Sequence, residues 1–158
     1  MKKLLKAIEE DSRLESDQLG VMFDMTAKEI DDMIRQYEKD GVILGYTALI
    51  DWDKTDLEYV SAMIELNVEP RRDTGFDEIA EKIYSFDEVK SVYLMSGGFD
   101  LLVMIEGRTM REVAYFVARK LASMKDVTAT ATHFVLRKYK DKGVVFGPPQ
   151  KDERGNII

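Results

Sequence analysis

The stretch that decides the fold lies in the second half of the chain, at residues 89–106. It reads Val89-Lys90-Ser91-Val92-Tyr93-Leu94-Met95-Ser96-Gly97-Gly98-Phe99-Asp100-Leu101-Leu102-Val103-Met104-Ile105-Glu106. Two β-rich runs are separated here by Ser-Gly-Gly, a combination typical of a tight turn between antiparallel strands. The sequence therefore predicts a hairpin whose strands span 89–95 and 99–106.

The segments on either side of this hairpin alternate between helical and strand patterns. Alternating apolar residues predict strands at 59–68 and 127–138, and apolar residues at helical spacing predict helices at 75–85 and 109–123. The resulting order, β-α-β-β-α-β, is that of a ferredoxin-like domain. Two helices can cover only one face of such a sheet. The other face keeps apolar side chains, so we expect it to be buried by sheet-to-sheet dimerisation.

The first 51 residues have a different pattern, with three short amphipathic helices predicted at 2–11, 17–23 and 27–39. Thr26 is a suitable N-cap for the third helix, and Glu29 completes a capping box. The β-rich segment 42–51 follows and predicts a strand or wing. This outline fits a winged helix-turn-helix. By itself it fits a generic helical bundle equally well.

The predicted class is therefore α+β, with an N-terminal winged helix-turn-helix and a C-terminal ferredoxin-like βαββαβ domain. The predicted domains are residues 1–51 for the helix-turn-helix, 52–58 for a linker, 59–140 for the ferredoxin-like domain and 141–158 for a C-terminal tail. The chain contains no cysteine and no apolar run of the roughly 20 residues that a bilayer span needs. We expect a cytoplasmic protein without a membrane partner.

Three stretches resemble the Lrp/AsnC family of leucine-responsive and asparagine regulators. Residues 37–46, with Gly41-Val42-Ile43 and Gly45-Tyr46, are similar to the end of the family's recognition helix and its wing. Residues 92–102 resemble its Gly-x-Tyr/Phe-Asp-Leu-Leu hairpin, and residues 127–136 resemble its last strand. Each stretch is weak alone, but together they occur in the family's order and at fitting spacing.

The resemblance implies that the ferredoxin-like domain is of the RAM or ACT type. It also implies homodimers that associate further into tetramers or octamers, with an amino acid or similar effector bound at an interface between dimers. Carried over by position, the effector-binding residues are Ser96, Gly97, Gly98, Asp100, Thr130 and Thr132. Backbone N–H groups at glycines suit a carboxylate, and an aspartate suits an α-ammonium group. A purely structural reading stays open, because glycines serve any tight hairpin and threonines suit any half-exposed strand.

The resemblance also implies double-stranded operator DNA as a partner. The candidate DNA-binding residues are Thr26, Ala27, Lys28 and Arg35 on the third helix and Lys2, Lys3 and Lys6 on the first. The family usually has arginine just before the position of Ile34, whereas Asp32 and Met33 stand there in this chain. Residues 1–51 contain 7 Lys and Arg against 12 Asp and Glu, a poor match to phosphate. The alternative is a metabolite-binding oligomeric module with a degenerate DNA-binding head.

Enzyme chemistry has little support in the sequence. His133 is the only histidine, and it stands on a predicted strand between a threonine and a phenylalanine. No nucleophile paired with a base, phosphate-binding loop or metal-ligand spacing is present. Some relatives of this architecture are sirohaem decarboxylases, but the arginines of their wing segment are missing from 42–46. We therefore predict a regulator of transcription with no catalytic residue, metal or cofactor.

Overall fold

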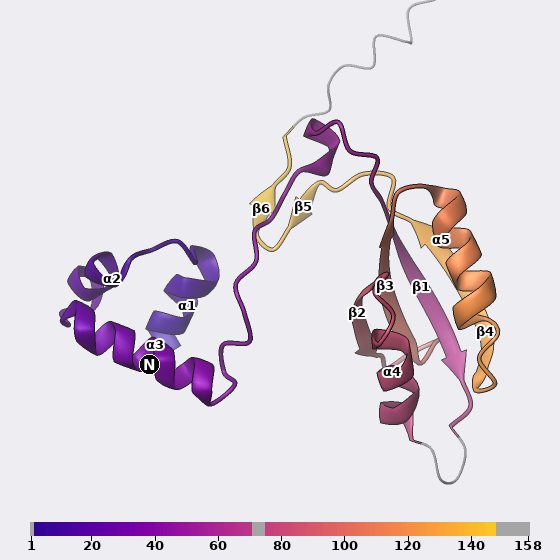
Figure 1. Ribbon diagram of the computed structural model, residues 1–158, viewed down its shortest axis with the longest axis horizontal. Coiled ribbons are helices and arrows are strands. Elements are labelled where there is room, and N and C mark those ends of the chain that lie inside the picture. The colour runs from indigo at the N-terminus through magenta and orange to yellow at the C-terminus, as the bar shows by residue number, and fades with distance from the viewer. Residues whose placement is uncertain (1, 71–74, 148–158) are drawn as a thin grey trace, which may run out of the picture. The chain divides into compact units, whose positions relative to one another are not determined.

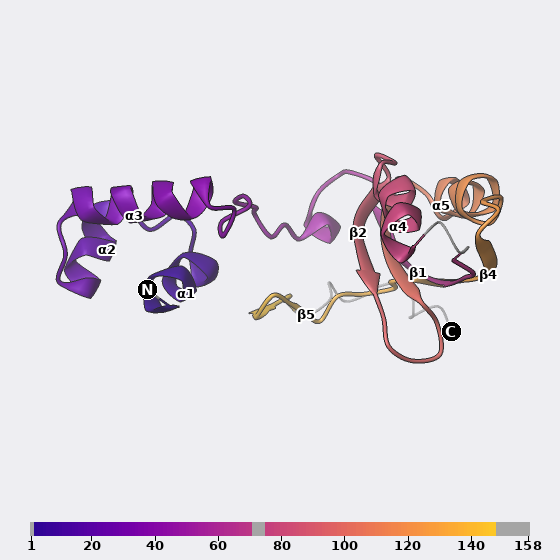
Figure 2. The ribbon, with the colours of Figure 1, turned by 90° about the horizontal axis from the view of Figure 1, so that it is seen from below.

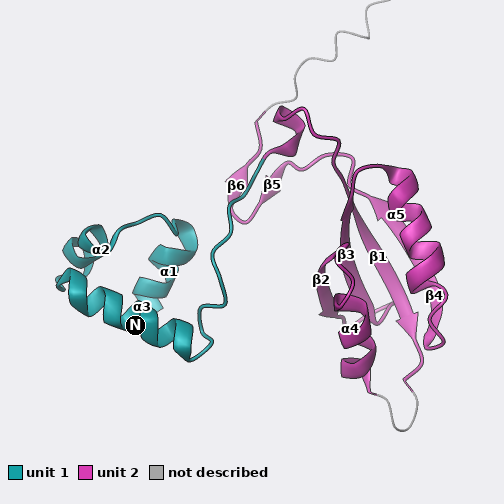
Figure 3. Ribbon diagram, in the orientation of Figure 1, with its two compact units in different colours: residues 1–50 teal, residues 51–158 magenta. Residues whose placement is uncertain are grey.

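A computed structural model describes residues 2–70 and 75–147 of the chain. The chain divides into two compact units, residues 1–50 and residues 51–158 (Figure 3). Each unit has its own hydrophobic core, so the boundary follows the packing and not only the sequence pattern.

The first unit contains three helices, α1 (Lys2–Glu10), α2 (Ser16–Phe23) and α3 (Ala27–Lys39). Their core is formed by buried side chains from all three, namely Leu4, Ile8, Leu19, Ile30 and Tyr37. The bounds of α3 are those predicted, and its capping box is confirmed. Thr26 Oγ1 accepts a hydrogen bond from the N–H of Glu29 at 3.2 Å, and Glu29 Oε2 accepts one from the N–H of Thr26 at 2.8 Å. The α2 prediction was one residue short, and Glu15 occupies the N-cap position.

A tight turn joins α2 to α3. Asp24 adopts a left-handed conformation (φ 55°), and the N–H of Met25 donates to the carbonyl of Gly20 at 2.9 Å. Gly20 is buried, and a Cβ atom placed on it would lie 2.6 Å from the carbonyl oxygen of Met25. Real Cβ contacts are not that short, so the two helices meet at this distance only because residue 20 has no side chain.

The segment after α3 differs from the prediction of a β-rich wing. Gly41 (φ 68°) ends the helix as expected, and the N–H groups of Val42 and Ile43 donate to the carbonyl of Tyr37 at 2.8 and 3.1 Å. Beyond them, residues 44–50 form no strand with any described part of the chain. A strand needs a hydrogen-bonding neighbour, and β propensity alone does not supply one.

The second unit contains a sheet with the strands β1 (Val60–Val68), β2 (Val89–Leu94), β3 (Leu101–Gly107) and β4 (Val127–Phe134) in the spatial order β2-β3-β1-β4. All three neighbouring pairs are antiparallel. The connecting helices are α4 (Phe76–Tyr84) and α5 (Met110–Phe116), and α5 continues as the π-helical segment Val117–Leu121 (Figures 1 and 2). This arrangement confirms the predicted ferredoxin-like fold.

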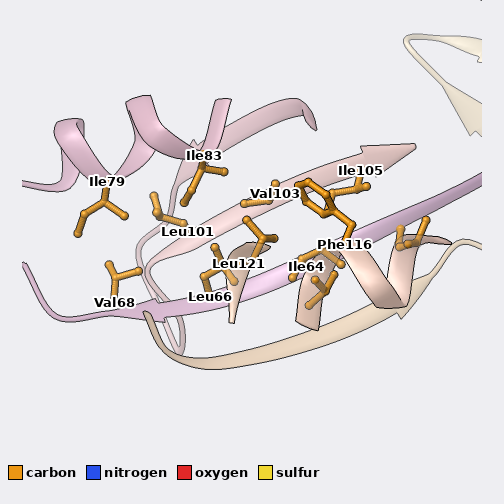
Figure 4. Packing of buried hydrophobic residues seen from close by; sticks show 13 residues of the cluster. Ile64, Leu66, Val68, Ile79, Ile83, Leu101, Val103, Ile105, Phe116 and Leu121 are labelled. Carbon is orange, nitrogen blue, oxygen red and sulfur yellow. The ribbon is translucent and has the colours of Figure 1, made fainter. Parts of the chain in front are cut away.

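The core of this unit lies between one face of the sheet and the two helices (Figure 4). Ile64 and Leu66 are fully buried in the central strand β1, as are Ile79 and Ile83 of α4 and Leu121 after α5. Side chains of a strand alternate between its two faces, so every second residue of β1 enters this core. The burial pattern of β1 is therefore the alternation that the sequence predicted.

Neither α4 nor α5 covers the opposite face of the sheet. Strand register places on it Met63 opposite both Met104 of β3 and His133 of β4, and Tyr93 of β2 opposite Leu102 of β3. Met63 is 38% exposed and Tyr93 is 52% exposed. The face is thus partly apolar and is not covered by the helices of its own unit, as the sequence led us to expect.

Short elements flank the sheet. A 3-10 turn, Trp52–Lys54, precedes β1, and a small hairpin of β5 (Lys140–Asp141) and β6 (Val144–Val145) follows β4. Lys142 (φ 44°) and Gly143 (φ 84°) form the two-residue turn of that hairpin. Part of the predicted tail is therefore ordered, because the two positive φ angles allow the chain to fold back on itself. Residues 148–158 of that tail lie outside the described residues.

Candidate DNA-binding and effector-binding sites

The candidate DNA-binding residues of α3 are held at its N-terminal end by the helix cap. Thr26 and Lys28 are exposed and Ala27 is half-buried, while the opposite face of the helix is anchored by Ile30 and Tyr37. Arg35 is exposed two turns further along. The first turn of a helix in this position is the part that normally meets base edges, and it is presented here to solvent.

Two aspartates on the same helix differ in their surroundings. Asp31 is half-buried and accepts a hydrogen bond from the hydroxyl of Ser16, at the start of α2. Its carboxylate thus links the two helices of the helix-turn-helix. Asp32 is exposed and is the residue that stands where the family usually has a cation. The sequence gives no reason to distinguish two adjacent aspartates, and only the packing of α2 on α3 separates them.

The three lysines of α1 form its solvent face. Lys2, Lys3 and Lys6 are exposed, whereas Leu4 and Ile8 are buried against the other helices. The amphipathic pattern of α1 therefore presents the cations outward, where phosphate groups could be contacted.

The candidate effector residues begin with the loop between β2 and β3. Ser96, Gly97 and Gly98 are exposed, and Gly97 has φ 147°, a conformation that favours glycine. The N–H of Met95 donates to the carbonyl of Asp100 at 2.8 Å and closes the loop. Figure 2 shows the loop extending beyond the end of the sheet. Its backbone N–H groups are therefore accessible from solvent.

Asp100 is fixed where this loop meets the central strand. Its N–H donates to the carbonyl of Leu66 at 2.9 Å, and its Oδ2 accepts from the N–H of Val68 at 2.8 Å. Those bonds give Asp100 a structural role at the end of β1, beside a register shift between Asn67 and Val68. The carboxylate keeps a second oxygen with which a ligand could interact.

Thr130 and Thr132 lie on the adjoining strand β4. Their register partners on β1 are Leu66 and Ile64, so both threonines face the helix-covered side of the sheet, where they are half-buried. Thr130 and Asp100 lie on opposite sides of Leu66, and the strands β4 and β3 are separated by two strand spacings, roughly 10 Å. Within one chain the six residues thus extend from the β2–β3 loop to the middle of β4 without converging on one point.

Two hollows of the second unit lie away from the candidate effector residues. One is lined by Trp52, Asp56, Leu57, Glu58, Tyr59, Asp87, Glu88, Lys90, Glu106, Gly107 and Arg108, and includes a stack of Trp52 on Tyr59 with ring centroids 5.5 Å apart. Tyr59 Oη donates to Glu106 Oε1 at 2.5 Å, and burial together with this carboxylate raises the pKa of the tyrosine. The other, of about 360 Å³, lies beside α5. Neither contains any of the six predicted effector residues, and sequence analysis predicted neither, because their walls come from distant segments.

His133 lies on the uncovered face of the sheet, where its Nε2 is 3.3 Å from Glu65 Oε1. Both side chains are substantially exposed. The described residues include no group of His, Cys, Asp and Glu side chains that could hold a metal ion. Across the same residues, no helix is long and apolar enough to cross a membrane.

Comparison with known proteins decides the family. The domain family described as the Lrp/AsnC ligand binding domain matches residues 61–145. The chain belongs to the Lrp/AsnC family. It is 46% identical over 153 residues to the HTH-type transcriptional regulator YugG of Bacillus subtilis, covering 96% of this chain and 92% of that protein.

More distant members of the Lrp/AsnC family are similar over most of their length. The leucine-responsive regulatory protein of Haemophilus influenzae is 23% identical over 87% of this chain and 82% of its own. A transcriptional regulator of Neisseria meningitidis, solved as a complex with L-methionine, has a TM-score of 0.71 at 24% identity and covers 88% of this chain and 89% of its own. The family and these relatives are transcriptional regulators and not enzymes, which confirms the class predicted from the motifs.

Proposed function

We propose that this chain is a cytoplasmic, sequence-specific DNA-binding regulator whose affinity for its operator responds to an amino acid or a related small metabolite. The observation that carries the DNA-binding half is the α2–α3 pair, in which Gly20 permits close packing and the capping box fixes the exposed first turn of α3. Asp31 is half-buried and bonded to Ser16, so of the two adjacent aspartates of α3 only Asp32 is exposed.

The proposed DNA contacts are Thr26 and Ala27 toward base edges and Lys28, Arg35 and the α1 lysines toward phosphates. The test is gel-shift titration of the full chain on the DNA upstream of its own gene, at low salt, with and without a panel of amino acids. Retardation that an amino acid strengthens or weakens is the expected result. No retardation at micromolar protein under any of these conditions would reject the DNA-binding half.

The effector site that we propose is built from the β2–β3 loop, Asp100 and the two threonines of β4. Because these residues do not converge within one chain, we propose that a second copy completes the site at an interface of a dimer, tetramer or octamer. L-Methionine in the Neisseria relative supports an amino acid as the ligand class. In this geometry the loop N–H groups bind the carboxylate, and Asp100 binds the ammonium group.

Asp100 offers a substitution that separates its two roles. Asp100→Asn keeps an oxygen that accepts from the N–H of Val68 but removes the negative charge. We expect the variant to fold as the wild type and to bind its amino acid about 10- to 100-fold more weakly, the equivalent of the roughly 1.5–3 kcal/mol typical of a hydrogen bond to a charged group. Calorimetry with a panel of amino acids measures this. Unchanged affinity would leave Asp100 with only its structural role.

Asp100→Ala serves as the matched comparison. It removes the acceptor for the N–H of Val68 as well, so a loss of stability of about 1.5–3 kcal/mol is expected in addition to the loss of binding. Equal stabilities of Asp100→Asn and Asp100→Ala would show that the hydrogen bond from the N–H of Val68 does not stabilise the fold.

The assembly that we propose uses the uncovered face of the sheet. Met63, Met104, Leu102 and Tyr93 supply its apolar area, and Glu65 and His133 supply a polar pair within it. Met63→Glu places a charge at the centre of that face, and analytical ultracentrifugation should show dissociation of the dimer. A mass unaffected by this change would place the dimer contact on another surface.

The second candidate function is a metabolite-binding oligomeric module that has lost DNA binding. Exposed Asp32 and the excess of carboxylates in residues 1–51 favour it. Amino-acid binding in the calorimeter without any DNA retardation selects this alternative.

A further inference from the structure

The exposed side of α5 carries an unusual concentration of positive charge. Between residues 108 and 125 the chain has five cations and one carboxylate, within a protein of net charge −7. The cations are Arg108, Arg111, Arg119, Lys120 and Lys125. The carboxylate, Glu112, accepts from the N–H of Arg108 at 2.9 Å, at the beginning of the helix.

An exposed tyrosine stands between two of these arginines. The guanidinium carbon of Arg111 is 5.8 Å from the centroid of the Tyr115 ring, and that of Arg119 is 4.9 Å from it. Both arginines are exposed, and Tyr115 is 48% exposed. We call Arg111, Tyr115 and Arg119 the α5 stripe.

The tyrosine ring lies beside both guanidinium groups without neutralising them. Cation–π contact uses the face of a guanidinium group and leaves its N–H edge for hydrogen bonds, which match a phosphate bidentately. None of the ion pairs within the described residues involves Arg111 or Arg119. The stripe therefore presents two cations to solvent.

We infer that the α5 stripe is a second contact surface for the phosphate backbone of duplex DNA, additional to the helix-turn-helix. The inference rests on the proposed function, and charge complementarity supports it. Both guanidinium carbons lie within 5.8 Å of the same ring centroid, so the two arginines form one cationic patch that can contact neighbouring phosphates of the backbone. The cations that α3 lacks at Asp32 and Met33 are thus present on another element.

The position of the stripe keeps it available in the proposed dimer. The inward side of α5, with Val113 and Phe116, packs on the helix-covered face of the sheet, and dimerisation is proposed to use the other face. The hollow beside α5 is lined by Tyr115 and Arg119 but also by Glu88, Glu106 and Glu112. Those carboxylates disfavour phosphate, so the proposed contact is with the outer edge of the helix.

The test compares the salt dependence of DNA binding among full-length variants. Arg111→Gln with Arg119→Gln removes both charges of the stripe. Lys140→Gln with Lys142→Gln removes two charges from the β5–β6 hairpin and is the matched control. Fluorescence anisotropy on the upstream DNA, from 50 to about 300 mM salt, gives the slope of log K against log salt concentration.

The variant with Arg111→Gln and Arg119→Gln should reduce that slope by about 1.8 for each copy whose stripe contacts DNA. It should also weaken DNA binding about 30-fold at 0.15 M salt if affinity at 1 M salt is unchanged. The control should keep the wild-type slope. Arg111→Lys with Arg119→Lys, which keeps the charge, should restore most of it. Circular dichroism should show that all variants are folded, because the replaced side chains are exposed.

Several outcomes overturn the inference. Equal slopes for the wild type and the double glutamine variant of the stripe would do so. An equal reduction of the slope in the control variant would also do so, because it would indicate a general effect of charge. A change in oligomer mass would show that the stripe binds an acidic surface of another copy. A wild-type chain that binds no DNA at low salt rejects the proposed function itself, so the two failures are distinguishable.

Discussion

Replacing Gly20 with alanine tests whether the close approach of α2 and α3 holds the helix-turn-helix together. The new Cβ atom would lie 2.6 Å from the carbonyl oxygen of Met25, which is 0.8 Å less than the 3.4 Å at which ordinary contact begins. The atom in the way belongs to the backbone of the turn that leads into α3. It cannot move aside as a flexible side chain would, so the turn itself must shift.

The expected magnitude is the difference between two effects. Overpacking a buried site costs typically 1–3 kcal/mol. Alanine in place of glycine within a helix recovers up to about 1 kcal/mol. We therefore expect the first unit to lose roughly 1–2 kcal/mol of stability, which corresponds to about 5- to 30-fold faster amide exchange in α1, α2 and α3.

Hydrogen–deuterium exchange of the full chain, read by mass spectrometry of peptides from each unit, measures the effect. Gly45→Ala is the matched control, because Gly45 has no neighbouring atom within 4 Å of an added Cβ. It should leave exchange in the helices unchanged. If Gly20→Ala exchanges as slowly as the wild type, the α2–α3 turn accommodates a side chain and the packing argument is wrong.

Three further changes test other parts of the structure. Ile64→Ala should lower the free energy of unfolding in urea by about 2–5 kcal/mol. Met63→Ala, one residue away on the uncovered face, should lower it far less, and similar losses would contradict the assignment of the two faces. Thr26→Ala should remove the cap and cost about 1 kcal/mol, measured as exchange protection of α3. Hydrogen bonds from Thr26 lower the pKa of Glu29, so the stability that its charge contributes is present above the unfolded pKa and is lost as pH falls through the folded pKa. Glu29→Gln should therefore reduce the loss of α3 protection between neutral and acid pH, and an unchanged pH profile would contradict the capping role.

Much of the local structure follows from the sequence because it depends on near neighbours. The capping box needs only Thr26 and the residue three positions later, and the predicted bounds of α3 were correct. The alternation of β1 and the Ser96-Gly97-Gly98 turn are likewise local, and the antiparallel pairing of the two hairpin strands was confirmed. The family motifs added the class of protein, which neither periodicity nor composition contained.

Other features depended on segments far apart in the chain. The sequence could not show that Asp31 bonds to Ser16 while Asp32 stays exposed, since that depends on how α2 lies against α3. Nor could it show that Asp100 accepts from the N–H of Val68, 32 residues away. The strand predicted within residues 42–51 is absent for the same reason, because a strand requires a hydrogen-bonding partner.

The sequence by itself determined which residues are apolar at which spacing, and hence the helices, the strands and the fold that buries them. Only the tertiary structure decided which polar groups are used inside the molecule and which are left for a partner. Asp100 accepts a hydrogen bond from β1, whereas Arg111 and Arg119 lie beside the Tyr115 ring and are exposed. The reason is physical. Hydrophobic burial is non-directional and can be read from a periodic pattern, whereas a hydrogen bond or a cation–π contact requires two groups to meet at a defined distance and orientation.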